Sequence, residues 1–268
     1  MPASLDSIVS ATRKRVSASR RNADLRALER KASEHEPRGF RERLRHCAQN
    51  GPAIIAELKK ASPSKGLIRA AFHPPELACE LEQAGAAALS VLTDEEFFQG
   101  SLDYLRQASG ATSLPCLRKD FMVDEFQILE ARAHCADAIL LIVAALEQKD
   151  LVAFARRAQA HGLDVVCEVH DEAELQRALD AGCDLIGVNS RDLKTFQVDL
   201  ATAFRLADRV PPHCLRVAES GIHSGADLTR LRAAGYDAFL IGESLMRAER
   251  PGEALKILLE EARTVVSG

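Results

Sequence analysis

Short apolar runs alternate along this chain with longer stretches that have helical spacing. Eight such runs recur between Ala53 and Ser244, and most of them have a charged or polar residue at or next to the C-terminal end. Apolar runs of this length are typical of buried parallel strands, and the stretches between them, such as residues 74–85 and 171–182, are typical of covering helices. The pattern predicts an α/β fold, a single (β/α)8 TIM barrel with strands at 53–59, 88–93, 116–120, 138–143, 164–169, 185–190, 216–220 and 238–244.

The segment before the first run has a different character. Residues 1–48 hold 12 Lys/Arg against 6 Asp/Glu, and apolar positions at helical spacing predict one helix along residues 5–16 and a second that ends before Pro37. We therefore predict an N-terminal helical extension, residues 1–48, packed on a catalytic barrel of residues 49–268. Its basic face is solvated, attracts an anionic substrate through its long-range field, or does both.

Composition excludes several classes of function. The formal net charge is −4, tryptophan is absent and aromatic residues make up 4% of the chain, so no nucleic-acid partner is indicated. No segment reaches the roughly 20 apolar residues that a membrane span needs, and no signal peptide is evident. We predict a cytoplasmic protein with no membrane association.

Cysteines and histidines carry no metal or redox pattern. The 7 cysteines are scattered singly, which indicates neither a disulfide framework nor a zinc site, and Cys167 is expected to be a buried structural thiol. The 8 histidines show no i, i+4 pairing and are expected to be solvated or capping. Without a dinucleotide or Walker motif either, we predict no metal and no cofactor.

Charged residues close the predicted strands, where a barrel builds its active site. The period of two places Glu57 and Lys59 on one inward face of the first strand, and Arg118 is expected to turn away from Lys119 toward the surface or an interface. A purely structural ion pair would explain Glu57 and Lys59 alone. Because further polar residues converge on the same mouth, catalysis is favoured; these are Lys119, Glu168, Asn189 and Glu219.

Glycine-containing turns follow the last two strands. Ser220 and Gly221 come after the seventh strand, and Gly242, Glu243 and Ser244 come after the eighth. Glycine allows backbone N–H groups to approach an anion, and these two turns form the usual phosphate site of such barrels. The loop of residues 59–66 is either a mobile lid over the substrate or an ordinary solvated loop.

At these residues the chain closely resembles the indole-3-glycerol-phosphate synthase family. The matching stretches cover nearly the whole chain and include IIAELKKASPSKG (54–66), LSVLTDEEFFQGS (89–101), LRKDFMVDEFQI (117–128), EVHDEAEL (168–175), IGVNSRDLKTF (186–196), RVAESGI (216–222) and FLIGESLMR (239–247). The resemblance implies a cofactor-free reaction of tryptophan biosynthesis, in which a small phosphosugar, 1-(2-carboxyphenylamino)-1-deoxyribulose 5-phosphate, is cyclised, decarboxylated and dehydrated.

The chemistry of the candidate residues suits that reaction. Lys119 would be the general acid on the carbonyl oxygen, Lys59 would hold the substrate carboxylate, and Glu168, with Glu57 and Glu219 nearby, would move protons during water loss. The resemblance also implies that Asn189 and Arg191 orient the substrate, that Ser62, Ser220, Gly221 and Gly242 bind its phosphate, and that its aromatic ring lies against Phe98, Phe121, Leu140 and Leu193. An apolar wall of this kind shields the lysines from water, and we expect this to strengthen their electrostatic action and to ease their deprotonation.

Glu243 stands at a position where some members of the family have a small hydroxyl residue. An inward carboxylate would repel phosphate, so we expect its side chain to turn outward, its backbone N–H to serve the phosphate, and Ser244 to be the nearer hydroxyl. Two alternatives remain open: another phosphosugar barrel, either an isomerase or an aldolase, and a barrel that binds a phosphosugar without catalysis. The sequence does not say whether other enzymes of the pathway bind this protein.

Overall fold

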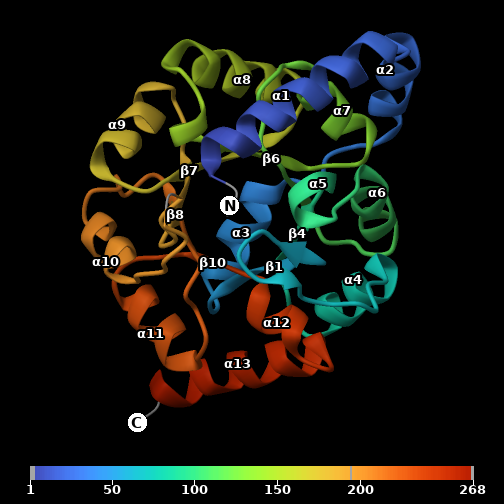
Figure 1. Ribbon diagram of the computed structural model, residues 1–268. Coiled ribbons are helices and arrows are strands. Elements are labelled where there is room, and N and C mark those ends of the chain that lie inside the picture. Colours follow the sequence, from blue (N-terminus) through green and yellow to red (C-terminus); the bar gives the residue numbers. More distant parts are fainter. Residues whose placement is uncertain (1–3, 194, 267–268) are drawn as a thin grey trace.

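Eight parallel strands close into a barrel surrounded by helices (Figure 1). This computed structural model describes residues 4–193 and 195–266. Neighbouring strands follow the order β1-β10-β9-β8-β7-β6-β5-β4, and the last pairs with the first. The predicted (β/α)8 barrel is confirmed, with strands β1 (Ala53–Leu58), β4 (Ala88–Leu92), β5 (Cys116–Lys119), β6 (Ala138–Ile142), β7 (Asp164–Val169), β8 (Leu185–Asn189), β9 (Leu215–Glu219) and β10 (Ala238–Ile241).

Helices follow the strands and cover the outside of the barrel. Several begin at side chains that cap their free N–H groups: Asp171 accepts from the backbone of Glu174, and Ser224 forms a capping box with Asp227. The covering helices are α4 (Pro74–Gln83), α6 (Leu102–Gly110), α7 (Phe126–Ala133), α8 (Gln148–Ala160), α9 (Glu172–Asp180), α10 (Ala201–Ala207), α11 (Gly225–Ala233) and α13 (Pro251–Val266). Shorter elements stand on the loops: the hairpin β2 (Ala61–Ser62) and β3 (Gly66–Leu67), and the helices α5 (Glu95–Phe98), η1 (Val143–Ala145) and α12 (Glu243–Arg247).

Side chains of each strand divide between two cores, as the period of two requires. Ile55 packs inside the barrel with Leu117 and Val217, whereas Ala56 and Leu58 pack outward beneath the helices. The interior is therefore filled over most of its length, and space for a ligand remains at the mouth.

Three helices precede the barrel: α1 (Leu5–Asn22), α2 (Leu25–Glu34) and α3 (Phe40–Ala48). In α3, Phe40 and Leu44 are fully buried against the first residues of the strands, such as Ala53 and Ala138, so this helix closes the end opposite the mouth. Helices α1 and α2 pack on α7 through small apolar clusters that include Val16 and Ala32.

A buried carboxylate ties the chain between α2 and α3 to the barrel. Asp137, just before β6, accepts hydrogen bonds from the backbone N–H and guanidinium of Arg38 and lies 3.0 Å from Nε2 of His35. Its Oδ2 also accepts from the backbone N–H of Cys116 at 2.7 Å. The division of the chain at residues 48 and 49 stays a prediction.

Two expectations about individual residues are wrong. Arg118 turns away from Lys119 as expected, but it is 1% exposed because helices cover this strand, and Asp120 and Glu130 supply its counter-charges at 3.0 and 2.9 Å. Cys167 is not a free thiol, since it forms a disulfide with Cys183. Across residues 4–193 and 195–266, no helix combines the length and the apolar character needed to cross a bilayer.

Candidate active site

A cavity of about 540 Å³ opens at the C-terminal ends of the strands. Sixteen of the seventeen residues proposed from the sequence for catalysis and binding line it: Glu57, Lys59, Phe98, Lys119, Phe121, Leu140, Glu168, Asn189, Arg191, Leu193, Glu219, Ser220, Gly221, Gly242, Glu243 and Ser244. The exception is Ser62, which lies on the hairpin strand β2, while Ser64 and Lys65 from the turn of that hairpin line the cavity.

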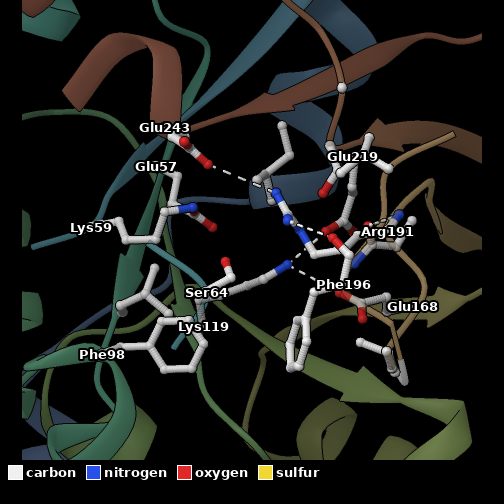
Figure 2. Close-up of a pocket in the computed structure, with 18 of the residues that line it drawn as sticks. Glu57, Lys59, Ser64, Phe98, Lys119, Glu168, Arg191, Phe196, Glu219 and Glu243 are labelled. Atoms are coloured by element: carbon white, nitrogen blue, oxygen red, sulfur yellow. Dashed lines mark hydrogen bonds and ion pairs between the residues drawn. The ribbon is translucent and has the colours of Figure 1, made fainter. Parts of the chain in front are cut away.

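Lys119 occupies the centre of the charged groups. Its ammonium lies 2.6 Å from Oε2 of Glu219 and 3.1 Å from Oε2 of Glu168, and Figure 2 shows these carboxylates converging on it. The three side chains come from β5, β9 and β7, and those of Glu168 and Glu219 are 3% and 1% exposed. At the same mouth, Glu57 from β1 accepts a 2.5 Å hydrogen bond from Lys59.

Burial and charge set distinct proton affinities for these groups. Burial alone would lower the pKa of Lys119, but the carboxylates of Glu219 and Glu168 raise it above its ordinary value. Burial raises the pKa of Glu219 to about 7, Lys119 opposes that rise, and the neighbouring Glu168 adds to it. The expectation that shielding would ease lysine deprotonation is therefore wrong for Lys119, because two carboxylates outweigh the loss of water.

The other carboxylates stay ionised. Burial acts to raise the pKa of Glu168, but Lys119 and the His170 ring hold it below its usual range. For Glu57, burial is likewise outweighed by Lys59 and Lys119, and its pKa is lowered. The site thus holds, near neutral pH, an ammonium donor, ionised carboxylate acceptors and one carboxyl group, Glu219, that is poised to exchange a proton.

Two glycines make room for the buried carboxylates. A Cβ at Gly187 on β8 would overlap the carboxylate of Glu219, and a Cβ at Gly242 would overlap the side chain of Glu57. Gly242 was predicted from the sequence to bind phosphate, and Gly187 was not predicted to have a role. No pattern within one strand could have indicated either steric role, because each depends on a neighbouring strand.

Apolar side chains form the opposite wall of the cavity. Phe98 and Phe121 lie with ring centroids 6.3 Å apart, and Leu140 and Leu193 line the same space. Helix α1 adds Leu5 and Ile8, and the loop after β8 adds Phe196. These three residues were not predicted to belong to the site, although Leu5 and Ile8 are part of the helical apolar pattern that predicts α1.

The turn after β9 has an unusual backbone. Ser220 and Gly221 both have left-handed φ values, +67° and +79°. Such a conformation is costly for serine and tends to persist at functional sites. At Gly221 a Cβ would also press on Val198 and Leu200, at 2.8 and 3.2 Å, so this turn lies tightly against the loop that follows β8.

Glu243 does not turn outward. Its carboxylate accepts from Nε of Arg247 at 3.1 Å and lies 3.9 Å from the guanidinium of Arg191 and 4.0 Å from the ammonium of Lys65. Figure 2 shows the contact with Arg191 across the cavity. The expectation failed because it considered only repulsion by phosphate and not the cations that the fold gathers around this position. Ser244 also lines the cavity.

The histidine expectation is wrong for two residues. His35 is held by Asp137, and His170 lies between Glu168 and Glu174 with its side chain 15% exposed. Sequence spacing could not identify His35, because its partner Asp137 lies 102 residues away. The partners of His170 are local, since Glu168 lies two residues before it and Glu174 four residues after it, and this spacing was the available signal. Among the described residues, no three His, Cys, Asp or Glu side chains are grouped so that they could hold a metal ion.

Comparisons with known proteins agree with this geometry. The family model described as indole-3-glycerol phosphate synthase matches residues 5–258. An indole-3-glycerol phosphate synthase of Koribacter versatilis (strain Ellin345) is 59% identical over 97% of this chain and 100% of its own length. The protein of the same name from Burkholderia ambifaria (strain MC40-6) is 49% identical over 94% of this chain and 97% of its own.

Solved structures of lower identity share only the fold. A 3-hexulose-6-phosphate synthase has a TM-score of 0.64 at 14% identity, covering 78% of this chain and 99% of its own. A thiamine phosphate pyrophosphorylase from Pyrococcus furiosus has a TM-score of 0.61 at 17% identity, covering 82% and 99%. The family model and the close relatives together decide the assignment: the chain belongs to the indole-3-glycerol phosphate synthase family.

Proposed function

We propose that the protein is an indole-3-glycerol phosphate synthase that converts 1-(2-carboxyphenylamino)-1-deoxyribulose 5-phosphate to indole-3-glycerol phosphate, carbon dioxide and water. The observation that carries this proposal is the ammonium of Lys119, held between two buried carboxylates at the edge of an apolar-walled cavity. Membership of the family supports it. The chemistry needs proton donors and acceptors together with a dry surface for an aromatic ring, and the cavity offers both.

Ring closure is assigned to the two lysines. The aromatic carbon that bears the carboxylate attacks the ribulose carbonyl, and the carbonyl oxygen takes a proton from Lys119 to become a hydroxyl group. Lys59 holds the substrate carboxylate, with Asn189 orienting the sugar. Carbon dioxide then leaves, and the electron pair of the broken bond restores the aromatic ring. The ammonium of Lys119 favours ring closure because the negative charge of the developing alkoxide forms close to it, in a site of low dielectric constant.

Water loss is assigned to the carboxylates. The new hydroxyl group leaves with a proton from an acid, and a base takes a proton from the adjacent ring carbon as the double bond forms. Glu168, whose pKa is held low by Lys119 and His170 against the effect of burial, suits the base. Glu219, whose pKa lies at about 7, and Glu57 lie close enough to supply and collect protons in the same cluster.

The remaining contacts bind the two ends of the substrate. We assign the phosphate to the turns at Ser220, Gly221, Gly242, Glu243 and Ser244, together with Arg191. A phosphate role for Ser62, which lies on β2 and does not line the cavity, stays a prediction from the family resemblance. The backbone N–H of Glu243 donates a hydrogen bond to the phosphate. The carboxylate of Glu243 loses its ion pair with Arg191 when the phosphate binds. The aromatic ring is assigned to the wall of Phe98, Phe121, Leu140 and Leu193. The extension of residues 1–48 completes the wall through Leu5 and Ile8. A cytoplasmic location without a nucleic-acid partner also remains part of this proposal.

The test is turnover by purified protein in EDTA, without added nucleotide, followed through indole fluorescence. We expect conversion of the substrate, and a large loss of kcat in Glu168→Gln with the fold retained. Absence of turnover in the wild type would reject the proposal. Borohydride treatment with substrate separates the aldolase alternative, since a covalent adduct on Lys59 or Lys119 would indicate Schiff-base chemistry instead.

A further inference from the structure

His170 is fixed beside the active site by a contact from α9. It is the first residue after β7, and both its backbone N–H and its Nδ1 face the same oxygen, Oε2 of Glu174, at 2.8 and 3.0 Å. The side chain is 15% exposed. One carboxylate therefore sets both the backbone and the ring orientation of this residue.

The other ring nitrogen faces a residue of the proposed catalytic set. Nε2 of His170 lies 3.5 Å from Oε1 of Glu168, and it is buried without a hydrogen bond within the described part of the chain. The second oxygen of Glu168, Oε2, contacts Lys119 at 3.1 Å. One oxygen of this carboxylate thus faces the ammonium and the other faces the imidazole, and the side chain of Asn189 also hydrogen-bonds the carboxylate.

The partners of the two ring nitrogens indicate the protonation form of His170. An ionised carboxylate only accepts hydrogen bonds, so Nδ1, beside Glu174, carries a hydrogen. A neutral ring would then present the lone pair of Nε2 to the lone pairs of Glu168. Burial lowers the pKa of His170, but the hydrogen bond with Glu174 and the charges of Glu168, Glu174 and Glu219 raise it above its usual value. These contacts favour an imidazolium whose Nε2–H points to Glu168.

We propose that His170 is a positioning residue: its imidazolium, oriented by Glu174, holds the carboxylate of Glu168 in place for proton transfer. This inference rests on the proposed function, because it concerns the base of that reaction. His170 does not line the cavity and acts through Glu168. A second ion pair on Oε1 keeps Oε2 directed at Lys119 and keeps Glu168 ionised between turnovers.

Two substitutions separate this role from a structural one. In His170→Gln the side-chain amide nitrogen reaches the place of Nε2 and still donates to Glu168. In His170→Asn the amide reaches only the place of Nδ1, so the contact with Glu174 survives and the contact with Glu168 is lost. We expect kcat to fall about 10- to 100-fold in His170→Asn with KM nearly unchanged, and His170→Gln to recover most of that loss.

The opposite order would overturn the inference. If His170→Asn kept the kcat of the wild type while His170→Gln lost it, the residue would serve only to join the strand to α9. His213→Asn, at an exposed position, is the matched control and should leave kcat unchanged. Wild-type turnover is measured first, so failure of the proposed function is distinguished from failure of this inference.

Glu174→Gln provides a second measurement if the histidine variants do not fold. Glutamine keeps an acceptor for the backbone N–H and Nδ1 of His170 but removes the charge that favours the imidazolium. We expect a several-fold lower kcat with a similar KM, whereas Glu172→Gln, on the exposed side of the same helix, should match the wild type. Wild-type kcat in Glu174→Gln would contradict the proposed role.

Discussion

Replacing Lys119 with methionine should remove most of the activity and leave the fold intact. The ammonium attracts Glu219 at 2.6 Å and Glu168 at 3.1 Å. At an effective dielectric constant of about 20, these gross attractions are about 6 and 5 kcal/mol. Without them the buried carboxylates take up protons, because an unpaired buried charge is costly. Methionine fills a similar volume, so we expect the packing to survive.

The loss has two causes that act together. Removal of a general acid costs about 10²- to 10⁴-fold in rate, and protonation of Glu168 removes the base as well. We therefore expect kcat to fall by at least about 10³-fold at neutral pH. Because the pKa of Glu168 rises when the ammonium is gone, its ionised fraction increases only at higher pH. The residual rate of Lys119→Met should accordingly climb with pH across the range where the wild type is already fully active.

Indole fluorescence measures the rate, and circular dichroism with thermal unfolding checks the fold. Lys256→Met is the matched control, since Lys256 lies on α13 with its side chain 47% exposed. It should keep wild-type kcat and KM. A folded Lys119→Met enzyme with near-normal kcat would refute both the acid assignment and the electrostatic argument for the base.

Two further predictions concern residues that support the site. Gly187→Ala should displace the carboxylate of Glu219 and lower kcat at least about tenfold, measured against Gly110→Ala, whose added Cβ meets no atom within 4 Å. Asp137→Asn should lower the free energy of unfolding by about 3 kcal/mol in urea at pH 7, because it leaves Arg38 without its buried counter-charge. Burial would raise the pKa of Asp137, but His35 and Arg38 lower it. The ionised carboxylate therefore stabilises the fold above the unfolded pKa of about 3.9, and the difference between wild type and variant should shrink as pH falls through the lower, folded value. An unchanged difference at acidic pH would contradict this assignment.

Strand positions and the inward-facing charges were accessible from the sequence because both follow from local periodicity. Seven of the eight predicted runs coincide with the strands to within one residue at each end, and the last strand ends three residues earlier than predicted, at Ile241. All six polar residues named at the strand ends line one cavity. A parallel barrel brings the C-terminal ends of its strands to the same rim. The fold class alone therefore predicts that Lys119, Glu168 and Glu219 converge.

Residues that act through neighbours were not accessible in this way. Arg118 was predicted to lie at the surface because the alternation of side chains along a strand gives the direction of a side chain but not what covers it. Its partner Glu130 comes from α7, which covers this strand. Glu243 was expected to face outward because two of its three cationic neighbours, Lys65 and Arg191, belong to loops far away in the sequence. The third, Arg247, lies four residues further along the same helix.

The amino-acid sequence by itself determined the barrel, its strand ends and the kinds of acid and base gathered at the mouth, because hydrophobic period and chain order act over a few residues at a time. Only the tertiary structure decided the proton affinities. The raised pKa of Lys119 and the value of about 7 for Glu219 arise from burial and from contacts between side chains of β5, β7 and β9. Desolvation and Coulomb interactions depend on distances of a few ångströms between segments as many as 100 residues apart, and no local pattern carries them.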